Sequence, residues 1–145
     1  MIPYGKQDIS LEDIEEVIKV LKSDYLTQGP VVPRFEKLIS EYCGSKFSVA
    51  VNSATSALHI ACKALGVGKG DIVWTSANTF VASANCALYC GAEIDFVDID
   101  YETFNISIEE LTSKLERAKK LNQLPKVLIP VHLAGHSCDM ENIHM

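Results

Sequence analysis

The chain of 145 residues lacks the features that would direct it to nucleic acid or to a membrane. It contains only two arginines, Arg34 and Arg117, and its net charge of −6 leaves no basic stripe for a polyanion. No apolar run approaches the length of a membrane span, and the N-terminus lacks the basic-then-apolar order of a signal peptide. We therefore expect a cytoplasmic protein with no nucleic-acid or membrane partner.

The cysteines are few, odd in number and without a C-x-x-C pair. They are Cys43, Cys62, Cys86, Cys90 and Cys138. Cys86 and Cys90 can share one face of a helix, and residues 132–139 form a second cluster rich in metal-ligating side chains. Neither group has a recognised zinc spacing or a clear fourth ligand. The pattern predicts reduced core cysteines and no metal site.

Hydrophobic residues make up 48% of the chain and charged residues 22%, which is typical of one packed soluble domain. Apolar periodicity and capping residues predict helices over 10–23, 33–44, 52–65, 79–91 and 107–121. Short apolar runs predict strands over 47–51, 72–74, 94–97 and 127–131. Strands that alternate with helices of this length predict an α/β fold, with a mainly parallel sheet flanked by helices.

The most informative segment runs from Val49 to Leu65, where a predicted strand leads into a predicted helix. The helix begins within the run Asn52–Ala57, whose residues are small or hydroxylated. The first turn of a helix has unpaired N–H groups and the positive end of the helix dipole, so it can bind phosphate. The alternative is an ordinary N-cap, in which Asn52 or Ser53 only satisfies its own helix.

Ligands of open parallel sheets bind beyond the carboxyl ends of the strands, which we call the carboxyl edge. The loops expected there hold unusual residues, over 53–56, 76–80, 98–100 and 132–136. Phe80 at this edge can stack on a planar ring beside the phosphate site. The alternative is that Phe80 is a core aromatic.

Five motifs in this order resemble the DegT-type (DegT/DnrJ/EryC/StrS) sugar-nucleotide aminotransferases. They are Tyr25–Pro30, Asn52–His59, Thr79–Asn85, Phe96–Asp100 and Pro130–Gly135. The greatest likeness is to members that make a 4-amino sugar on the route to pseudaminic acid. The resemblance implies a fold-type-I enzyme with pyridoxal 5'-phosphate (PLP) as cofactor, and a homodimer with active sites at the subunit interface.

The resemblance also implies roles for individual residues. Ala54 and Thr55 would hold the cofactor phosphate, and Phe80 would stack on its pyridine ring. Four further residues match positions that line the substrate or cofactor site: Tyr4, Tyr25, Leu26 and Thr27. Asp100 and His132 match family motifs, but the residues alone assign them no role. The implied reaction is amino transfer from glutamate to a UDP-linked 4-keto-6-deoxy-N-acetylhexosamine.

The chain departs from the family pattern because it lacks the lysine and the acid on which PLP chemistry depends. In the family both lie beyond the motif at 130–135, and none of Lys63, Lys69 and Lys126 has the required context. We therefore expect residues 1–145 to be the N-terminal part of the PLP-binding large domain, inactive alone. The alternatives are a PLP-dependent sugar dehydratase of the same family and a non-enzymatic α/β module that binds a phosphorylated ligand.

Overall fold

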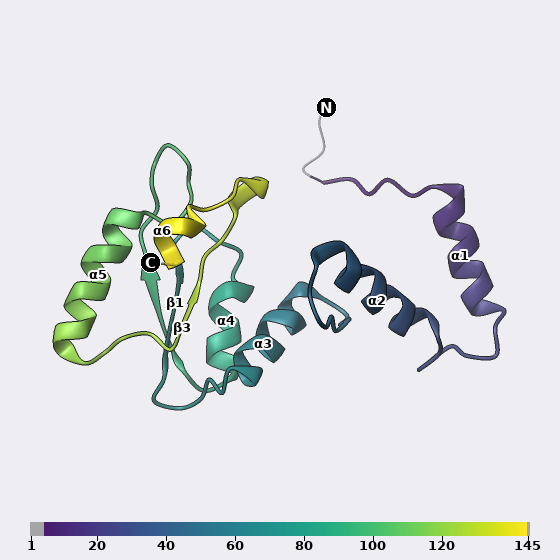
Figure 1. Cartoon of the computed structure of the whole chain (residues 1–145), viewed down its shortest axis with the longest axis horizontal. Helices are drawn as coiled ribbons and strands as arrows, with labels where there is room; N and C mark the ends of the chain where they lie inside the picture. The colour runs from purple at the N-terminus through teal and green to yellow at the C-terminus, as the bar shows by residue number, and fades with distance from the viewer. Residues whose placement is uncertain (1–4, 145) are drawn as a thin grey trace. The chain divides into compact units, whose positions relative to one another are not determined.

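The computed structural model describes residues 5–144, which divide into two compact units. The first unit lies within residues 1–50 and the second within residues 51–145. Each is described by itself, with the chain coloured from N- to C-terminus in Figure 1. Tyr4, one of the expected substrate-binding residues, lies outside the described residues.

The N-terminal unit contains two amphipathic helices, α1 (Leu11–Leu21) and α2 (Val31–Cys43). Ser10 and Asp13 form a capping box, because each side chain accepts a hydrogen bond from the other residue's backbone N–H, at 2.8 and 3.2 Å. Helix α2 ends at Gly44, whose left-handed φ of +66° stops it where the sequence predicts. Neither helix buries a residue, so their apolar faces are open.

The predicted strand over 47–51 is wrong for this structure. Phe47 and Val49 are 77% and 75% exposed, and no β-ladder includes this segment within the described residues. The segment contacts α2 instead, through the Ala50 N–H, which donates to the Glu36 carboxylate at 2.8 Å. A strand takes its hydrogen bonds from a neighbouring strand, so an apolar alternating run without such a neighbour stays irregular.

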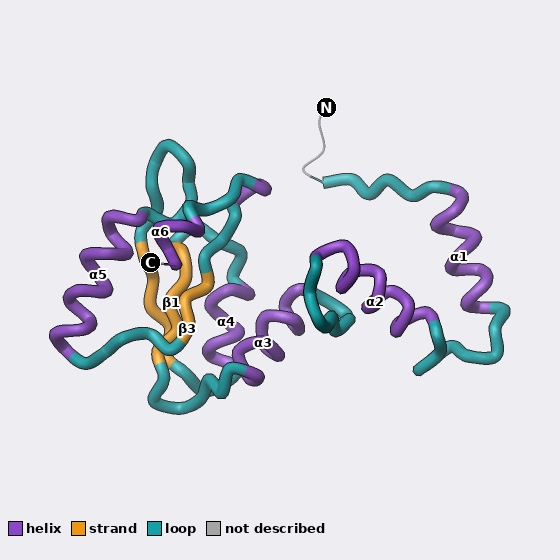
Figure 2. Tube along the Cα trace, viewed as in Figure 1, coloured by secondary structure: helices purple, strands orange, loops and turns teal. Residues whose placement is uncertain are grey.

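The second unit is a parallel α/β layer structure. Its elements are α3 (Ala54–Ala64), β1 (Ile72–Ser76), α4 (Ala82–Tyr89), β2 (Glu93–Val97), α5 (Ile108–Leu121), β3 (Val127–Ile129), the 3-10 helix η1 (Leu133–Gly135) and α6 (Met140–His144). The three strands pair in the order β2-β1-β3, all parallel, with Thr75 opposite Phe96 and Ile129. Figure 2 shows the sheet in orange between its helices, which confirms the predicted fold class.

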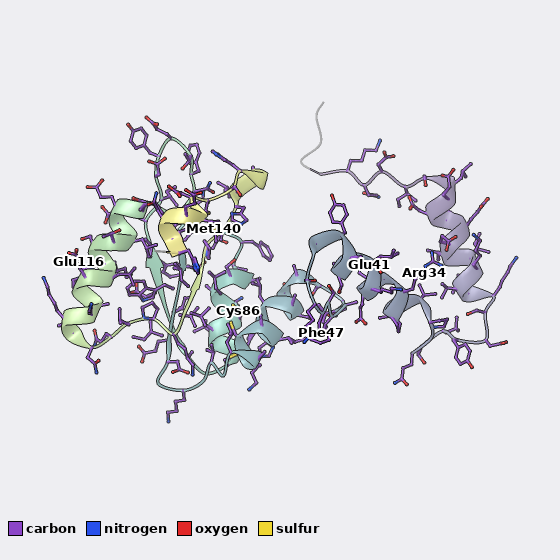
Figure 3. All side chains as sticks on the ribbon, in the orientation of Figure 1. Arg34, Glu41, Phe47, Cys86, Glu116 and Met140 are labelled. Atoms are coloured by element: carbon purple, nitrogen blue, oxygen red, sulfur yellow. The ribbon has the colours of Figure 1, made fainter. Side chains whose placement is uncertain are left out.

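Alternate residues of the central strand β1 belong to two cores on opposite faces of the sheet. Val73 packs with Cys62 of α3 and Cys86 of α4, which Figure 3 labels. Trp74 packs on the other face with Leu111 of α5 and with Val97. This period-2 alternation follows from strand geometry and explains why β1 is buried on both faces, including its two polar residues Thr75 and Ser76.

Several element boundaries differ from the prediction, including the end of β1, which extends two residues past Trp74 to Ser76. The helix predicted from Thr79 begins at Ala82, because Thr79 Oγ1 bonds to Ser83 Oγ at 2.8 Å and residues 79–81 form a turn. Strand β3 ends at Ile129, two residues before the predicted end. Within residues 5–144, none of the helices has both the length and the apolar character of a membrane span.

Candidate functional site

Helix α3 leads into the central strand β1. A short turn, closed by the Val67 N–H on the Cys62 carbonyl, joins the end of α3 to the start of β1. The helix packs against α4, the helix that follows β1. The segments that follow β2 and β3 leave the sheet at the same end (Figure 1). This edge collects the loops in which the sequence predicts a ligand.

The first turn of α3 has both a cap and free donors. Ser53 Oγ accepts the N–H of Ser56 at 3.2 Å, so Ser53 is the N-cap of α3. The Ala57 N–H is already paired, with the Ser53 carbonyl. Among the described residues, nothing accepts a hydrogen bond from the N–H of Ala54 or Thr55. The cap thus leaves two backbone donors at the positive end of the helix.

Phe80 lies in the loop between β1 and α4 and is 74% exposed. The alternative that this residue is a core aromatic is therefore wrong for this chain. Its ring offers a flat apolar surface in the same unit as the start of α3. An exposed aromatic ring at the mouth of a sheet crevice is suited to stacking on a planar ligand.

Ser76 ends the central strand with a buried hydroxyl that has no hydrogen-bond partner in the described part of the chain. A buried unpartnered hydroxyl is unusual in a folded protein and calls for an explanation. Its position at the carboxyl edge is where a bound group would supply the missing partner. Our sequence analysis placed Ser76 in this loop region but gave it no role, since burial is not visible in the sequence.

Asp100 has a structural role in this chain. Its carboxylate accepts the N–H of Thr103 at 2.8 Å, the Thr103 hydroxyl at 2.9 Å and the N–H of Glu102 at 3.1 Å. These bonds, chiefly those from Thr103, lower the pKa of Asp100. All three close the turn that follows β2, which leaves the carboxylate committed to the loop.

His132 follows β3, and its loop is held by Asn105, a residue that sequence analysis did not single out. Asn105 is 4% exposed and bonds the backbone of Leu133, His136 and Ser137. An asparagine in a polar loop gives no sequence signal for such contacts, because they join positions about thirty residues apart. Among residues 5–144, no three His, Cys, Asp or Glu side chains are grouped to hold a metal ion.

The predicted site residues are divided between the two units. Ala54, Thr55 and Phe80 lie in the second unit, whereas the loop Tyr25–Thr27 between α1 and α2 lies in the first. Tyr25 and Leu26 are exposed, at 61% and 65%. The residues of the second unit fit a phosphate joined to a flat ring: two backbone donors, the Thr55 hydroxyl, an exposed aromatic and a buried hydroxyl without a partner.

Comparison with known proteins agrees with this geometry. The DegT/DnrJ/EryC1/StrS aminotransferase family matches residues 7–145. A UDP-4-amino-4,6-dideoxy-N-acetyl-beta-L-altrosamine transaminase of Campylobacter jejuni is 41% identical over 143 residues, which is 99% of this chain and 37% of the relative. Two further curated relatives are matched over 35% of their own length. The chain thus spans about a third of the length of the curated relatives it matches.

Two solved structures are similar along almost the whole chain. Helicobacter pylori PseC, an aminotransferase involved in the biosynthesis of pseudoaminic acid, has a TM-score of 0.85 and 31% identity, and covers 97% of this chain and 37% of its own. Spr1654 of Streptococcus pneumoniae, solved in PLP and PMP forms, has a TM-score of 0.86 and 34% identity over 99% of this chain and 35% of its own. Motifs, fold and comparisons together show that the chain belongs to the DegT/DnrJ/EryC1/StrS aminotransferase family.

Proposed function

We propose that the chain is the N-terminal part of the PLP-binding large domain of a sugar-nucleotide aminotransferase. The reaction is amino transfer from glutamate to a UDP-linked 4-keto-6-deoxy-N-acetylhexosamine, in a cytoplasmic homodimer that serves amino-sugar biosynthesis for surface polysaccharide or flagellin glycans, including pseudaminic acid. The transaminase activity of the Campylobacter relative on a UDP-linked amino sugar supports this substrate class, and the role of Helicobacter PseC in pseudoaminic acid biosynthesis supports the pathway. The observation that carries the proposal is the first turn of α3, with two unpaired N–H groups.

The chain's own residues would bind and orient the cofactor. The N–H groups of Ala54 and Thr55 and the Thr55 hydroxyl donate to the phosphate, where the helix dipole adds to the attraction. Phe80 supplies a flat apolar surface that fixes the plane of the ring. When bound, PLP supplies the electron sink for the chemistry. Tyr4 and the loop Tyr25–Thr27 are proposed to line the nucleotide-sugar site.

Two substitutions in the full-length enzyme separate these roles. Thr55→Val removes one hydroxyl donor at nearly constant volume, so PLP affinity should fall about tenfold or more, and excess PLP should restore most of the rate. Phe80→Ala removes the surface that orients the ring, so turnover should stay low at saturating PLP. The measurement is the rate of amino transfer against PLP concentration.

Matched controls keep this test specific. Thr112→Val makes the same change on the exposed outer side of α5, where the hydroxyl only bonds the Ile108 carbonyl, and should leave PLP affinity unchanged. Phe80→Tyr retains the ring and should keep most of the turnover. Full rescue of Phe80→Ala by PLP, or normal affinity and rate in Thr55→Val, would show that the cofactor does not bind here.

The chain by itself should have no transaminase activity, because none of its lysines has the context of the catalytic lysine. The assay combines the purified 145-residue chain with PLP, glutamate and the UDP-4-keto sugar. Free PLP transaminates slowly, so the comparison is with PLP alone. Turnover above that background would contradict the proposal that the catalytic lysine lies outside these residues.

A further inference from the structure

The loop after β3 is held by one buried side chain, Asn105, from the segment between β2 and α5. The Asn105 amide nitrogen donates to the carbonyls of His136 and Ser137, each at 3.1 Å, and its oxygen accepts the Leu133 N–H at 3.0 Å. Both donor hydrogens and the acceptor are therefore used, which sets the orientation of the amide. Asn105 is 4% exposed, so these bonds form away from water and constrain the loop strongly.

A second contact within the loop fixes His132. The Cys138 N–H donates to His132 Nδ1 at 3.0 Å, and the Cys138 thiol is itself anchored on the Val131 carbonyl at 3.2 Å. An imidazole nitrogen that accepts a hydrogen bond carries no proton, so the neutral ring has its proton on Nε2. Between these anchors Ala134 has a φ of +52°, a conformation that a non-glycine residue keeps only where its surroundings impose it.

The exposed His132 side chain stands at the carboxyl edge, three residues after β3 ends. That edge also has the Ser76 hydroxyl without a partner and the exposed ring of Phe80, all within the second unit. Figure 2 shows the segment after β3 leaving the sheet at the same end as the loop after β2. A fixed N–H donor at this edge is suited to an oxygen acceptor of a bound ligand.

We propose that Asn105 is a positioning residue that holds His132 as an Nε2–H donor to an oxygen of the ligand at the carboxyl edge. The ligand class rests on the proposed function, whereas the tautomer of His132 depends on this chain alone. Asn105 acts at a distance from the ligand. Its hydrogen bonds hold both ends of the 133–137 segment and thereby place the Cys138 N–H against His132 Nδ1. Loss of these bonds should allow the His132 ring to exchange tautomers and to rotate.

The direct test is the tautomer of His132 in the full-length protein without added PLP, labelled with nitrogen-15 at histidine only. Long-range proton–nitrogen correlation spectra distinguish a ring with an unprotonated Nδ1 from one with an unprotonated Nε2. The wild type should show the Nε2–H form at His132, assigned by its loss in His132→Gln. Asn105→Ala should show a mixture of the two tautomers. A wild-type mixture, or an unchanged signal in Asn105→Ala, would overturn the proposal.

Kinetics of the PLP-saturated enzyme give a second, independent readout. Loss of a well-placed donor to an oxygen should lower kcat about 10- to 100-fold in Asn105→Ala, with both KM values changed less than about twofold. His132→Gln places an amide N–H near the position of Nε2 and should keep more of kcat than His132→Asn, whose shorter side chain does not reach it. Equal kcat in all three variants and the wild type would overturn the proposal.

Controls separate positioning from simple loss of stability. Asp71→Ala breaks the bonds to the Gly68 N–H and Lys126 at the opposite edge of the sheet, so it should lower the melting temperature without changing the His132 signal or kcat. If Asn105→Ala does not fold, Asn105→Asp replaces it, since this variant keeps the acceptor for Leu133 and loses both donations. A wild type without amino transfer would contradict the proposed function, while the tautomer spectra would still decide the role of Asn105.

Discussion

At the scale of single residues, Thr75 and Ser76 show how differently two adjacent buried hydroxyls can contribute. Both side chains are fully buried in β1. Thr75 Oγ1 donates to the Ile129 carbonyl at 2.9 Å and so joins the central strand to its neighbour. Ser76 Oγ is buried and has no hydrogen-bond partner among the described residues. The first hydroxyl stabilises the fold, whereas burial of the second without a partner is unfavourable.

Opposite effects on stability are therefore expected from two substitutions. Thr75→Val should lower the free energy of unfolding by about 0.5–1.5 kcal/mol, the usual net contribution of one hydrogen bond. Ser76→Ala should leave it unchanged or raise it by up to about 1 kcal/mol, because an unpartnered hydroxyl is removed. Urea denaturation without cofactor measures both. A larger loss in Ser76→Ala than in Thr75→Val would mean that Ser76 has a partner in the folded chain.

The Asp100 carboxylate should make part of the stability depend on pH. Its pKa is lowered in the folded chain by the bonds from Thr103, so its contribution is complete above the ordinary aspartate pKa and is lost as pH falls through the lowered value. Asp100→Asn keeps an acceptor for the turn but cannot titrate. When the free energy of unfolding is measured from pH 5 down to about pH 2, it should fall less in Asp100→Asn than in the wild type. If the free energy of unfolding depends on pH identically in the two proteins, Asp100 does not contribute to acid unfolding.

At the scale of elements, the turn between α3 and β1 joins the helix proposed to bind phosphate to the central strand. Gly70 has a φ of +89°, whereas Gly68 has an ordinary φ, and no atom lies within 4 Å of a Cβ added at either position. The two glycines therefore differ in backbone conformation and not in available space. Conformation alone should decide what an alanine does at each site.

Gly70→Ala should lower the free energy of unfolding by about 1–2 kcal/mol, because a side chain is strained at that φ. Gly68→Ala should be neutral or stabilise by about 0.4–1 kcal/mol, because it restricts only the unfolded chain. Thermal or denaturant unfolding of the two variants measures the difference. Equal effects at the two glycines would mean that the turn adapts its backbone to the new side chain.

At the scale of the whole molecule, the exposure of each cysteine thiol indicates which parts of the fold exclude solvent. Cys43 at the end of α2 is exposed, whereas Cys62, Cys86 and Cys138 are buried in the second unit. Burial, with the neighbouring Cys86 thiol, raises the pKa of Cys62 to about 12. At pH 8 the Cys62 thiol therefore stays protonated and unreactive.

A thiol reagent at pH 8 should therefore label Cys43 rapidly in the folded chain and label Cys62, Cys86 and Cys138 only when the second unit opens. Mass spectrometry of peptides after timed labelling gives the rate at each site, with the urea-unfolded chain as the reference in which all sites react. Adding urea below the midpoint should accelerate labelling of the three buried thiols together. Fast labelling of Cys62 in the native chain would contradict the closed packing of α3 on α4.

The sequence by itself determined the features that depend on neighbours along the chain. Ser10, Ser53 and Ser107 cap the helices α1, α3 and α5, because a cap bonds N–H groups only a few residues away. At Ser107, however, the second bond of a capping box is absent from the described contacts, since the Ser107 N–H donates to the Asp98 carbonyl. The family motifs in the loops of the carboxyl edge could likewise be recognised from the sequence, because each motif consists of residues adjacent in the chain.

Only the tertiary structure decided what depends on distant neighbours. The apolar run over 47–51 has the pattern of a strand but finds no partner strand in the described chain, and a strand cannot supply its own hydrogen bonds. The hydrogen bonds between Asn105 and the backbone of residues 133–137, and the burial of Ser76 without a partner, likewise result from contacts across the sheet. Hydrogen bonds between residues far apart in the chain leave no periodicity, so packing alone establishes them.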